Sequence, residues 1–198
     1  MKILFKCILI LALNSGCAAP LVFLGAGGVV TKKMAEERTV GMSLDDMTLW
    51  TAITRNLLKN ELAREVYDKV SIKVYEGRVM LAGSVKKQED KVELLRIIWA
   101  QNKVIEVIDE VRIDPTGGIR FTTYAKDSWI TTQIKSKLIL NKVVQSVNYS
   151  VETIDGIVYL IGVAKNEEEL SLATQIAGTV NGVAKVVSYI RLKPGSKA

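Results

Sequence analysis

The sequence predicts an α+β fold with two tandem domains, each made of two helices packed on one face of a three-stranded mixed sheet. One observation is an internal repeat, because the pattern of residues 46–113 recurs over residues 127–192. Another is the order of patterns within each copy, which runs helix, strand, strand, helix, strand. The composition agrees with globular domains, since 48% of the 198 residues are hydrophobic and 24% are charged.

The repeat is clearest in the first helix and in the strand pair. Residues 51–53 (TAI) correspond to residues 132–134 (TQI), an offset of 132 − 51 = 81. Residues 76–83 (EGRVMLAG) correspond to residues 155–162 (DGIVYLIG), an offset of 155 − 76 = 79. Copy two is therefore two residues shorter between these segments. A feature that only one copy carries is not required by the fold, so we look for function in the differences between the copies.

The first segment of each copy has the periodicity of an amphipathic helix. In copy one, Asp45 and Asp46 offer N-cap oxygens to a helix that runs to about Asn60. The predicted division of the chain is a signal peptide at 1–16, an acylated N-terminus and tether at 17–43, a first domain at 44–114, a linker at 115–124, a second domain at 125–193 and a C-terminal tail at 194–198.

Strand signals follow each helix. Val70, Ile72 and Val74 alternate with polar residues, which is the period of a half-buried strand. A tight turn at residues 76–77, and at the Asp-Gly pair 155–156, leads into a more continuously apolar and hence central strand. The remaining expected elements are second helices at residues 88–102 and 167–180, and last strands at residues 104–113 and 183–192.

Gly83 and Gly162 end the central strand at the same point of both copies. A glycine there predicts either a positive φ angle or the close approach of another backbone segment. We expect both glycines to be structural.

The residue inventory argues against an enzyme. The chain has no histidine, which removes the commonest general base and the commonest metal ligand. Cys7 and Cys17 both precede the domains, so the domains have no thiol and no disulfide. The three glutamates at 167–169 begin a predicted helix, where negative charge complements the helix dipole. We expect no cofactor, no metal site and no catalytic residue, and a hydrolase built from acidic pairs is only a formal alternative.

The N-terminus predicts export. Lys2 precedes a run at residues 3–13 that is apolar apart from Lys6 and is too short to span a bilayer. Cys17 directly follows Ser-Gly, as in a lipobox, which predicts cleavage after residue 16 and acylation of Cys17. Ala18 at the second mature position resembles the outer-membrane sorting class.

An uncleaved membrane anchor is the alternative, because apolar character continues through residues 21–30. Asn14 stands where a lipobox usually has leucine, whereas Pro20 argues against one continuous helix. Loss of residues 1–16 would remove two lysines and no acid, which leaves a net charge of 25 − 21 = +4.

Several segments resemble the BON domain family. They are residues 38–41 (RTVG), 44–46 (LDD), 48–49 (TL) and 127–132 (DSWITT), beside the αββαβ repeat with its strand glycine. The similarity, which is to dual-BON outer-membrane lipoproteins, covers nearly the whole mature chain. It implies a non-enzymatic, periplasm-facing lipoprotein whose second domain binds anionic phospholipid, namely phosphatidylglycerol and cardiolipin, through its first helix. It also implies a role in envelope integrity and cell division.

The residues of that helix point to the same surface. At 100° per residue, Ile130, Ile134 and Leu138 form the core stripe, and Trp129 lies about 140° from its centre. A tryptophan directed away from the core suits a bilayer interface, and copy one has Thr48 at the matching position. The predicted lipid-binding residues are Trp129, Thr132, Gln133, Lys135, Ser136 and Leu140.

Charge supports this prediction, since residues 128–142 hold three lysines and no acid, and Lys126 precedes the expected helix. Two alternatives stay open. Trp129 could pack against Phe121 or Tyr124, or seal the contact between the domains, and the same surface could dock an envelope protein, which would make the chain an interaction scaffold. We expect the other tryptophans, Trp50 and Trp99, to be packing residues.

Overall fold

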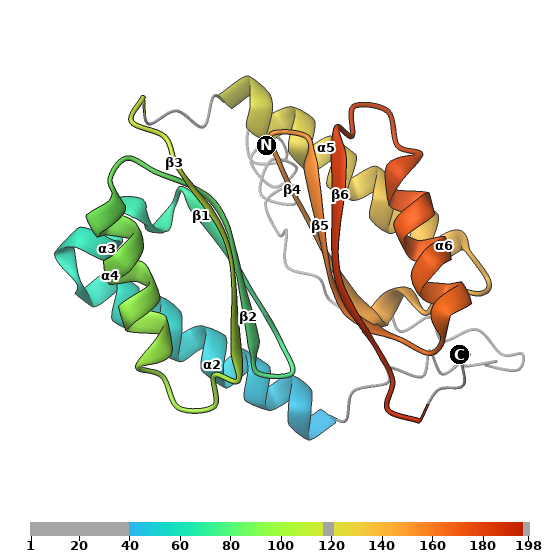
Figure 1. Cartoon of the computed structure of the whole chain (residues 1–198), viewed down its shortest axis with the longest axis horizontal. Coiled ribbons are helices and arrows are strands. Elements are labelled where there is room, and N and C mark those ends of the chain that lie inside the picture. The colour runs from blue at the N-terminus through green and yellow to red at the C-terminus, as the bar shows by residue number, and fades with distance from the viewer. Residues whose placement is uncertain (1–39, 117–120, 196–198) are drawn as a thin grey trace, which may run out of the picture. The chain divides into compact units, whose positions relative to one another are not determined.

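The structure is a computed structural model that describes residues 40–116 and 121–195 (Figure 1). Residues 34–198 form one compact unit. The predicted signal peptide, Cys17 and most of the predicted tether lie outside the described residues.

Both copies have the predicted order of elements, with one addition in each. Copy one comprises α2 (Val40–Lys59), α3 (Glu61–Tyr67), β1 (Val70–Tyr75), β2 (Arg78–Val85), α4 (Gln88–Trp99) and β3 (Glu106–Ile113). Copy two comprises α5 (Phe121–Leu140), the 3-10 turn η2 (Ser146–Asn148), β4 (Tyr149–Ile154), β5 (Ile157–Ala164), α6 (Glu167–Gly178) and β6 (Lys185–Leu192). The additions are α3 and η2, which stand at the same place in the two copies.

The sheets are three-stranded and mixed, as predicted. In the order β1-β2-β3, the first pair is antiparallel and the second is parallel, and β4-β5-β6 repeats this arrangement. The parallel pair requires a crossover, which α4 and α6 provide. Figure 1 shows the helices of each copy on one face of their own sheet. The predicted α+β fold class is therefore confirmed.

The hairpins use the predicted two-residue turns. Glu76 and Gly77 have φ values of 52° and 72°, and Asp155 and Gly156 have 52° and 75°. Two positive φ angles in succession are typical of a type I′ turn, whose twist matches that of the strands.

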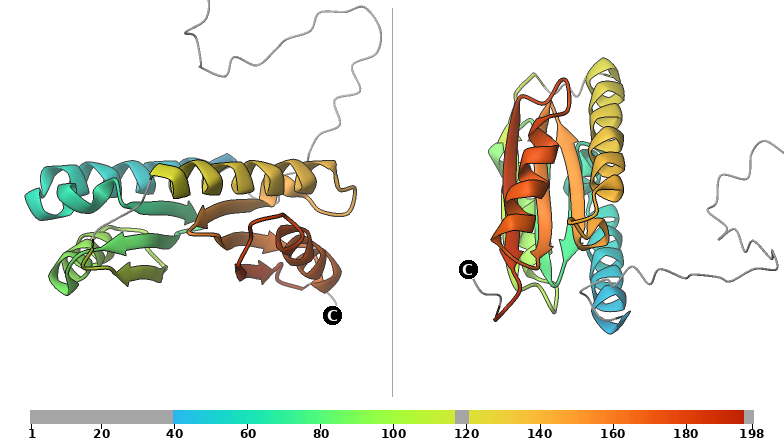
Figure 2. Two further views of the ribbon diagram at one scale, coloured as in Figure 1. Left: turned by 90° about the horizontal axis from the view of Figure 1, so that it is seen from above. Right: turned by 90° about the vertical axis from the view of Figure 1, so that its right-hand side faces the viewer.

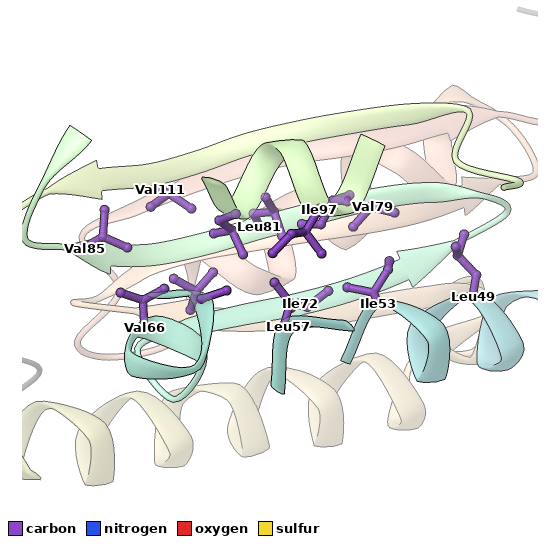
Figure 3. Packing of buried hydrophobic residues seen from close by; sticks show 14 residues of the cluster. Leu49, Ile53, Leu57, Val66, Ile72, Val79, Leu81, Val85, Ile97 and Val111 are labelled. Atoms are coloured by element: carbon purple, nitrogen blue, oxygen red, sulfur yellow. The ribbon is translucent and has the colours of Figure 1, made fainter. Parts of the chain in front are cut away.

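The core of each copy lies between its first helix and its sheet. Leu49, Ile53 and Leu57 are at most 4% exposed, and they face β1 and β2 (Figure 3). The equivalent residues of α5 are buried in the same way. The predicted core stripes are confirmed in both helices.

The strand glycines are required by close backbone approach. A Cβ at Gly83 would lie 2.2 Å from the Lys69 carbonyl oxygen, and one at Gly162 would lie 2.1 Å from that of Asn148. Only Gly83 also has a positive φ, of 147°.

The second face of each central strand is also buried. Val79 and Leu81 of β2 belong to the core beneath the helices, whereas Met80 and Ala82 belong to a separate apolar cluster. That cluster joins the two sheets and contains Tyr75, Met80, Ala82, Ile108, Tyr159, Ile161 and Val163. This two-sided burial explains why both central strands are continuously apolar.

Polar contacts surround this cluster. Arg78 donates from Nη1 to the Tyr189 carbonyl oxygen at 2.8 Å. Lys73 and Glu152 form an ion pair at 3.0 Å, and the Tyr189 hydroxyl donates to the Glu110 carboxylate. The two copies are thus joined sheet to sheet within one unit.

The predicted helix starts are wrong in both copies. α2 begins at Val40 and α5 at Phe121, so Lys126 lies within the helix and not before it. Asp46 does not cap a helix, because its carboxylate accepts the turn amides of Glu76 and Gly77 at 2.7 and 2.9 Å. Each of these long helices is therefore fastened to a hairpin turn by an aspartate inside it.

The expectation that Trp50 and Trp99 are packing residues is also wrong, since they are 41% and 56% exposed. Trp50 lies about 60° from the centre of its core stripe, at the margin of the buried face. Trp99 is the last residue of α4, beyond the buried Ile97 and Ile98. Among the described residues, no helix combines the length and the apolar character needed to cross a bilayer.

Candidate functional site

The candidate site is the outer side of α5, which the fold holds in one orientation. Ile130, Ile134 and Leu138 are at most 1% exposed and fix the inner side of the helix against the core of copy two. Near the start of the helix, the Asp127 carboxylate accepts the amides of Asp155 and Gly156 at 2.7 and 2.9 Å. In both views of Figure 2, no other described helix or strand covers the side of α5 that points away from β4.

This outer side carries most of the predicted residues. Trp129 is 50% exposed and Leu140 is 81% exposed, and about 20° separates them around the helix axis. Thr132, Lys135 and Ser136 are exposed as well, whereas Gln133 is half-buried. The structure therefore brings the six predicted residues onto one helix, with Gln133 at the edge of the exposed face.

Lysines flank this outer side. Lys135 lies on one flank of the Trp129–Leu140 face, and Lys126 and Lys137 lie on the other. The acidic residue of α5, Asp127, is 6% exposed and is bound to the hairpin turn. Across the described ranges, no carboxylate forms an ion pair with these three lysines. The exposed surface of α5 is consequently cationic.

The alternative that Trp129 seals the contact between the copies is not supported, and the Phe121 side chain lies outside the described part of the structure. The apolar cluster between the copies comes from the sheets and does not contain Trp129, and half of its side chain is exposed. Tyr124, a suggested partner, is itself 64% exposed.

Exposed apolar residues at the C-terminal end of α5 were not predicted as part of the site. Ile139 is 57% exposed, and Val143 and Val147, in the segment after the helix, are 49% and 36% exposed. A signal for Ile139 was available, because three consecutive apolar residues at 138–140 cannot all face the core of a surface helix.

The glutamate cluster lies in the first turn of α6 as predicted, and one of its members has a further structural role. Glu167, Glu168 and Glu169 begin α6 as expected, but Glu169 is only 1% exposed. Its carboxylate accepts the amides of Gln145 and Lys165 at 2.7 and 2.8 Å, and it thereby holds the segment after α5. Burial, and next the nearby Glu169 carboxylate, raise the pKa of the Tyr149 hydroxyl above its usual range. No cluster of potential metal ligands occurs in the two described ranges.

Two stretches of the chain, residues 45–115 and 126–194, match the family model of the BON domain. The chain is 34% identical over 150 residues to an uncharacterized protein of Anaplasma centrale, covering 76% of this chain and 96% of that one. It is 31% identical to the outer membrane lipoprotein DolP of Haemophilus influenzae, covering 89% and 88%. It is 30% identical to a 21 kDa hemolysin of Actinobacillus pleuropneumoniae, covering 78% of each chain. With two matched segments that span most of its length, the chain belongs to the BON domain family.

Proposed function

We propose that this protein is a non-enzymatic outer-membrane lipoprotein that binds anionic phospholipid, such as phosphatidylglycerol or cardiolipin, through the outer side of α5. The observation that carries the proposal is Trp129, half-exposed on a helix surface that has lysines and no exposed acid. The similarity to a protein named as an outer membrane lipoprotein, together with the lipobox-like Cys17, supports the proposed location at the outer membrane. From there the protein would support envelope integrity and cell division.

The chemistry of this surface suits a membrane of opposite charge. An indole ring places apolar area below the headgroups while its N–H stays hydrated. Each lysine near an anionic leaflet contributes about 1 kcal/mol. Such binding is weak in solution, but an acylated N-terminus would hold the domain at a high effective concentration beside the membrane.

A flotation assay with phosphatidylglycerol vesicles tests the proposal. A chain that begins at Met34, the first residue of the compact unit, keeps acylation out of the measurement. We expect Trp129→Glu to abolish flotation, because a carboxylate would face an anionic leaflet. Trp99→Glu is the matched control, since Trp99 is similarly exposed but lies on α4. Equal flotation of the two variants would contradict the proposal.

A protein partner on the same surface would give a different result. A photo-crosslinker at position 129 in intact envelopes should then capture a protein and not lipid. Binding by lysines to an anionic leaflet should weaken as salt rises, because exposed charges more than about 10 Å apart are largely screened at 0.1 M ionic strength. Insensitivity to salt would favour the protein partner.

A further inference from the structure

An apolar cleft opens beside Lys135 of α5. Its volume is about 250 Å³. The lining residues are Lys135, Leu138, Ile139, Ser146, Val147, Tyr149 and Val151. Leu138, Tyr149 and Val151 form a buried floor, at most 9% exposed, whereas Ile139 and Val147 stand exposed at the rim. Lys135 is thus the charged residue of an otherwise nearly apolar lining.

The cleft lies where the two copies of the repeat differ in length. Copy one has ten residues between α2 and β1 (60–69), whereas copy two has eight between α5 and β4 (141–148). In copy one this segment forms α3, which buries Ala63 and Val66 against the core. In copy two it forms only the turn η2, which buries Asn148 and leaves Val147 at the surface. The two-residue gap in the repeat therefore coincides with an opening at this edge of the core.

The opening is held in shape and does not result from a loose segment. The Asn141 side chain accepts the amides of Val143 and Val144 at 2.8 and 3.1 Å. The buried Glu169 carboxylate accepts the amide of Gln145 at 2.7 Å. Polar contacts thus fix the start of the segment, which contributes Ser146 and the apolar Val147 to the cleft.

The chemistry of the cleft selects its occupant. An apolar cavity offers water few hydrogen-bond partners, so a hydrocarbon group is a better occupant than solvent. The volume is below the roughly 300–1,000 Å³ of pockets that enclose whole ligands. It therefore suits part of one hydrocarbon chain and not a complete lipid. Lys135 at the rim supplies positive charge for a phosphate, and Ile139 belongs both to the cleft and to the exposed side of α5.

We infer that the cleft takes a segment of one acyl chain of an anionic phospholipid whose phosphate is bound by Lys135. This inference rests on the proposed function and adds to it, because it predicts that each protein molecule binds one lipid molecule at a defined site. A surface helix alone partitions into a bilayer, whereas a cleft also binds single lipid molecules in solution.

Monomeric lipid tests the inference. Dihexanoyl phosphatidylglycerol, kept below the concentration at which it forms micelles, is titrated into the chain that begins at Met34, and methyl NMR signals are followed. We expect saturable binding with shifts at Val147 and Val151. Val147→Trp should fill the cleft and weaken monomer binding about tenfold or more, since several methylene groups of the acyl chain lose their apolar site. Val143→Trp is the control, because Val143 is similarly exposed but does not line the cleft.

Further measurements separate the contribution of the lipid headgroup from that of the acyl chain. Lys135→Gln should weaken binding of the phosphatidylglycerol monomer more than binding of dihexanoyl phosphatidylcholine, because the choline cation partly neutralises the phosphate of the latter. Inorganic phosphate alone should not displace the lipid. Circular dichroism tests whether each variant is folded. If Val147→Trp does not fold, Lys135→Gln still tests the inference.

The two proposals fail in different ways. If the protein floats with vesicles through Trp129 but shows no saturable monomer binding, the cleft inference is wrong and the proposed function stands. If the monomer binds while Trp129→Glu floats normally, the proposed surface is wrong and the cleft stands. Equal effects of Val147→Trp and Val143→Trp on monomer binding would also overturn the cleft.

Discussion

The first helices of the two copies, α2 and α5, share one inner side and differ on the outer side. Both are 20 residues long, both bury three aliphatic residues at the same spacing, and both fasten an aspartate to a hairpin turn. On the outer side, α2 has Thr48 where α5 has Trp129. The comparison shows that the fold fixes the inner side and leaves the outer side free to diverge.

Exposed apolar area alone does not distinguish the helices. Leu44, Met47 and Leu58 of α2 are 52%, 59% and 45% exposed. What α2 has in addition is an exposed acid, Asp45, whose carboxylate binds Lys103 at 2.7 Å. The combination of a tryptophan with an acid-free exposed surface is what sets α5 apart, so it is the combination that predictions should separate.

The largest expected effect falls on the shared scaffold. Gly162→Ala should destabilise the protein by about 3 kcal/mol or more, because the new Cβ would meet a backbone oxygen. Gly83→Ala should cost at least as much, since it adds strain at a positive φ. Gly178→Ala, at the end of α6 with nothing closer than 3.9 Å, should stabilise by up to about 1 kcal/mol. Urea denaturation measures all three, and a mild Gly162→Ala would remove the close-approach argument.

The contacts of Asp46 and Asp127 with the hairpin turns should contribute equally to stability in both copies. Asp46→Ala and Asp127→Ala should each cost about 2–3 kcal/mol, because two turn amides lose a charged acceptor. Asp45→Ala is the neighbouring control and should cost less than about 1 kcal/mol, since its ion pair is exposed. Thermal unfolding compares them. A large difference between Asp46→Ala and Asp127→Ala would break the equivalence of the two inner sides.

Charge should act in copy two alone. Lys135→Gln with Lys137→Gln should weaken binding to phosphatidylglycerol vesicles by about 2 kcal/mol in total and reduce its salt dependence. Arg55→Gln with Lys59→Gln removes two cations from α2 and should leave binding nearly unchanged. Vesicle cosedimentation at several salt concentrations measures both pairs. Equal losses would show that the copies share the membrane surface.

The smallest expected effect is on the contact between the copies at high pH. Burial, and next the hydrogen bond to Glu110, raise the pKa of the Tyr189 hydroxyl to about 12 from its ordinary 10. The protonated hydroxyl is favoured in the folded state, so its contribution is complete below about pH 10 and is lost as pH rises to about 12. Tyr189→Phe should therefore unfold with a flatter pH dependence across this window. An unchanged slope in chemical denaturation would contradict the assignment to Tyr189.

The sequence was most informative where a pattern repeats locally. The core stripes, the two-residue turns and the strand glycines are set by spacing and by backbone needs, and all of them could be predicted. The helix starts could not, because Asp46 and Asp127 have the composition of N-caps, while their true partners lie about thirty residues away along the chain. The predicted burial of Trp50 and Trp99 was wrong because apolar character does not reveal which residues at the edge of a helix are covered by neighbouring elements.

The candidate site was predictable only in part. Trp129 could be placed on the outer side from helical geometry alone. The cleft beside Lys135 could not, since it depends on how the segment after α5 packs once it is two residues shorter.

Lys73 and Glu152 stand at equivalent positions, 152 − 73 = 79 residues apart, and they are bonded to each other. Glu110 and Tyr189 have the same relation and are also bonded. Contact between equivalent positions is the rule of two-fold dimers. If two first copies from separate chains paired in this way, Lys73 would meet Lys73, and two second copies would bring Glu152 against Glu152. The divergence of the halves therefore favours the pairing of a first copy with a second copy, and like-charge repulsion disfavours the pairing of identical copies from neighbouring molecules.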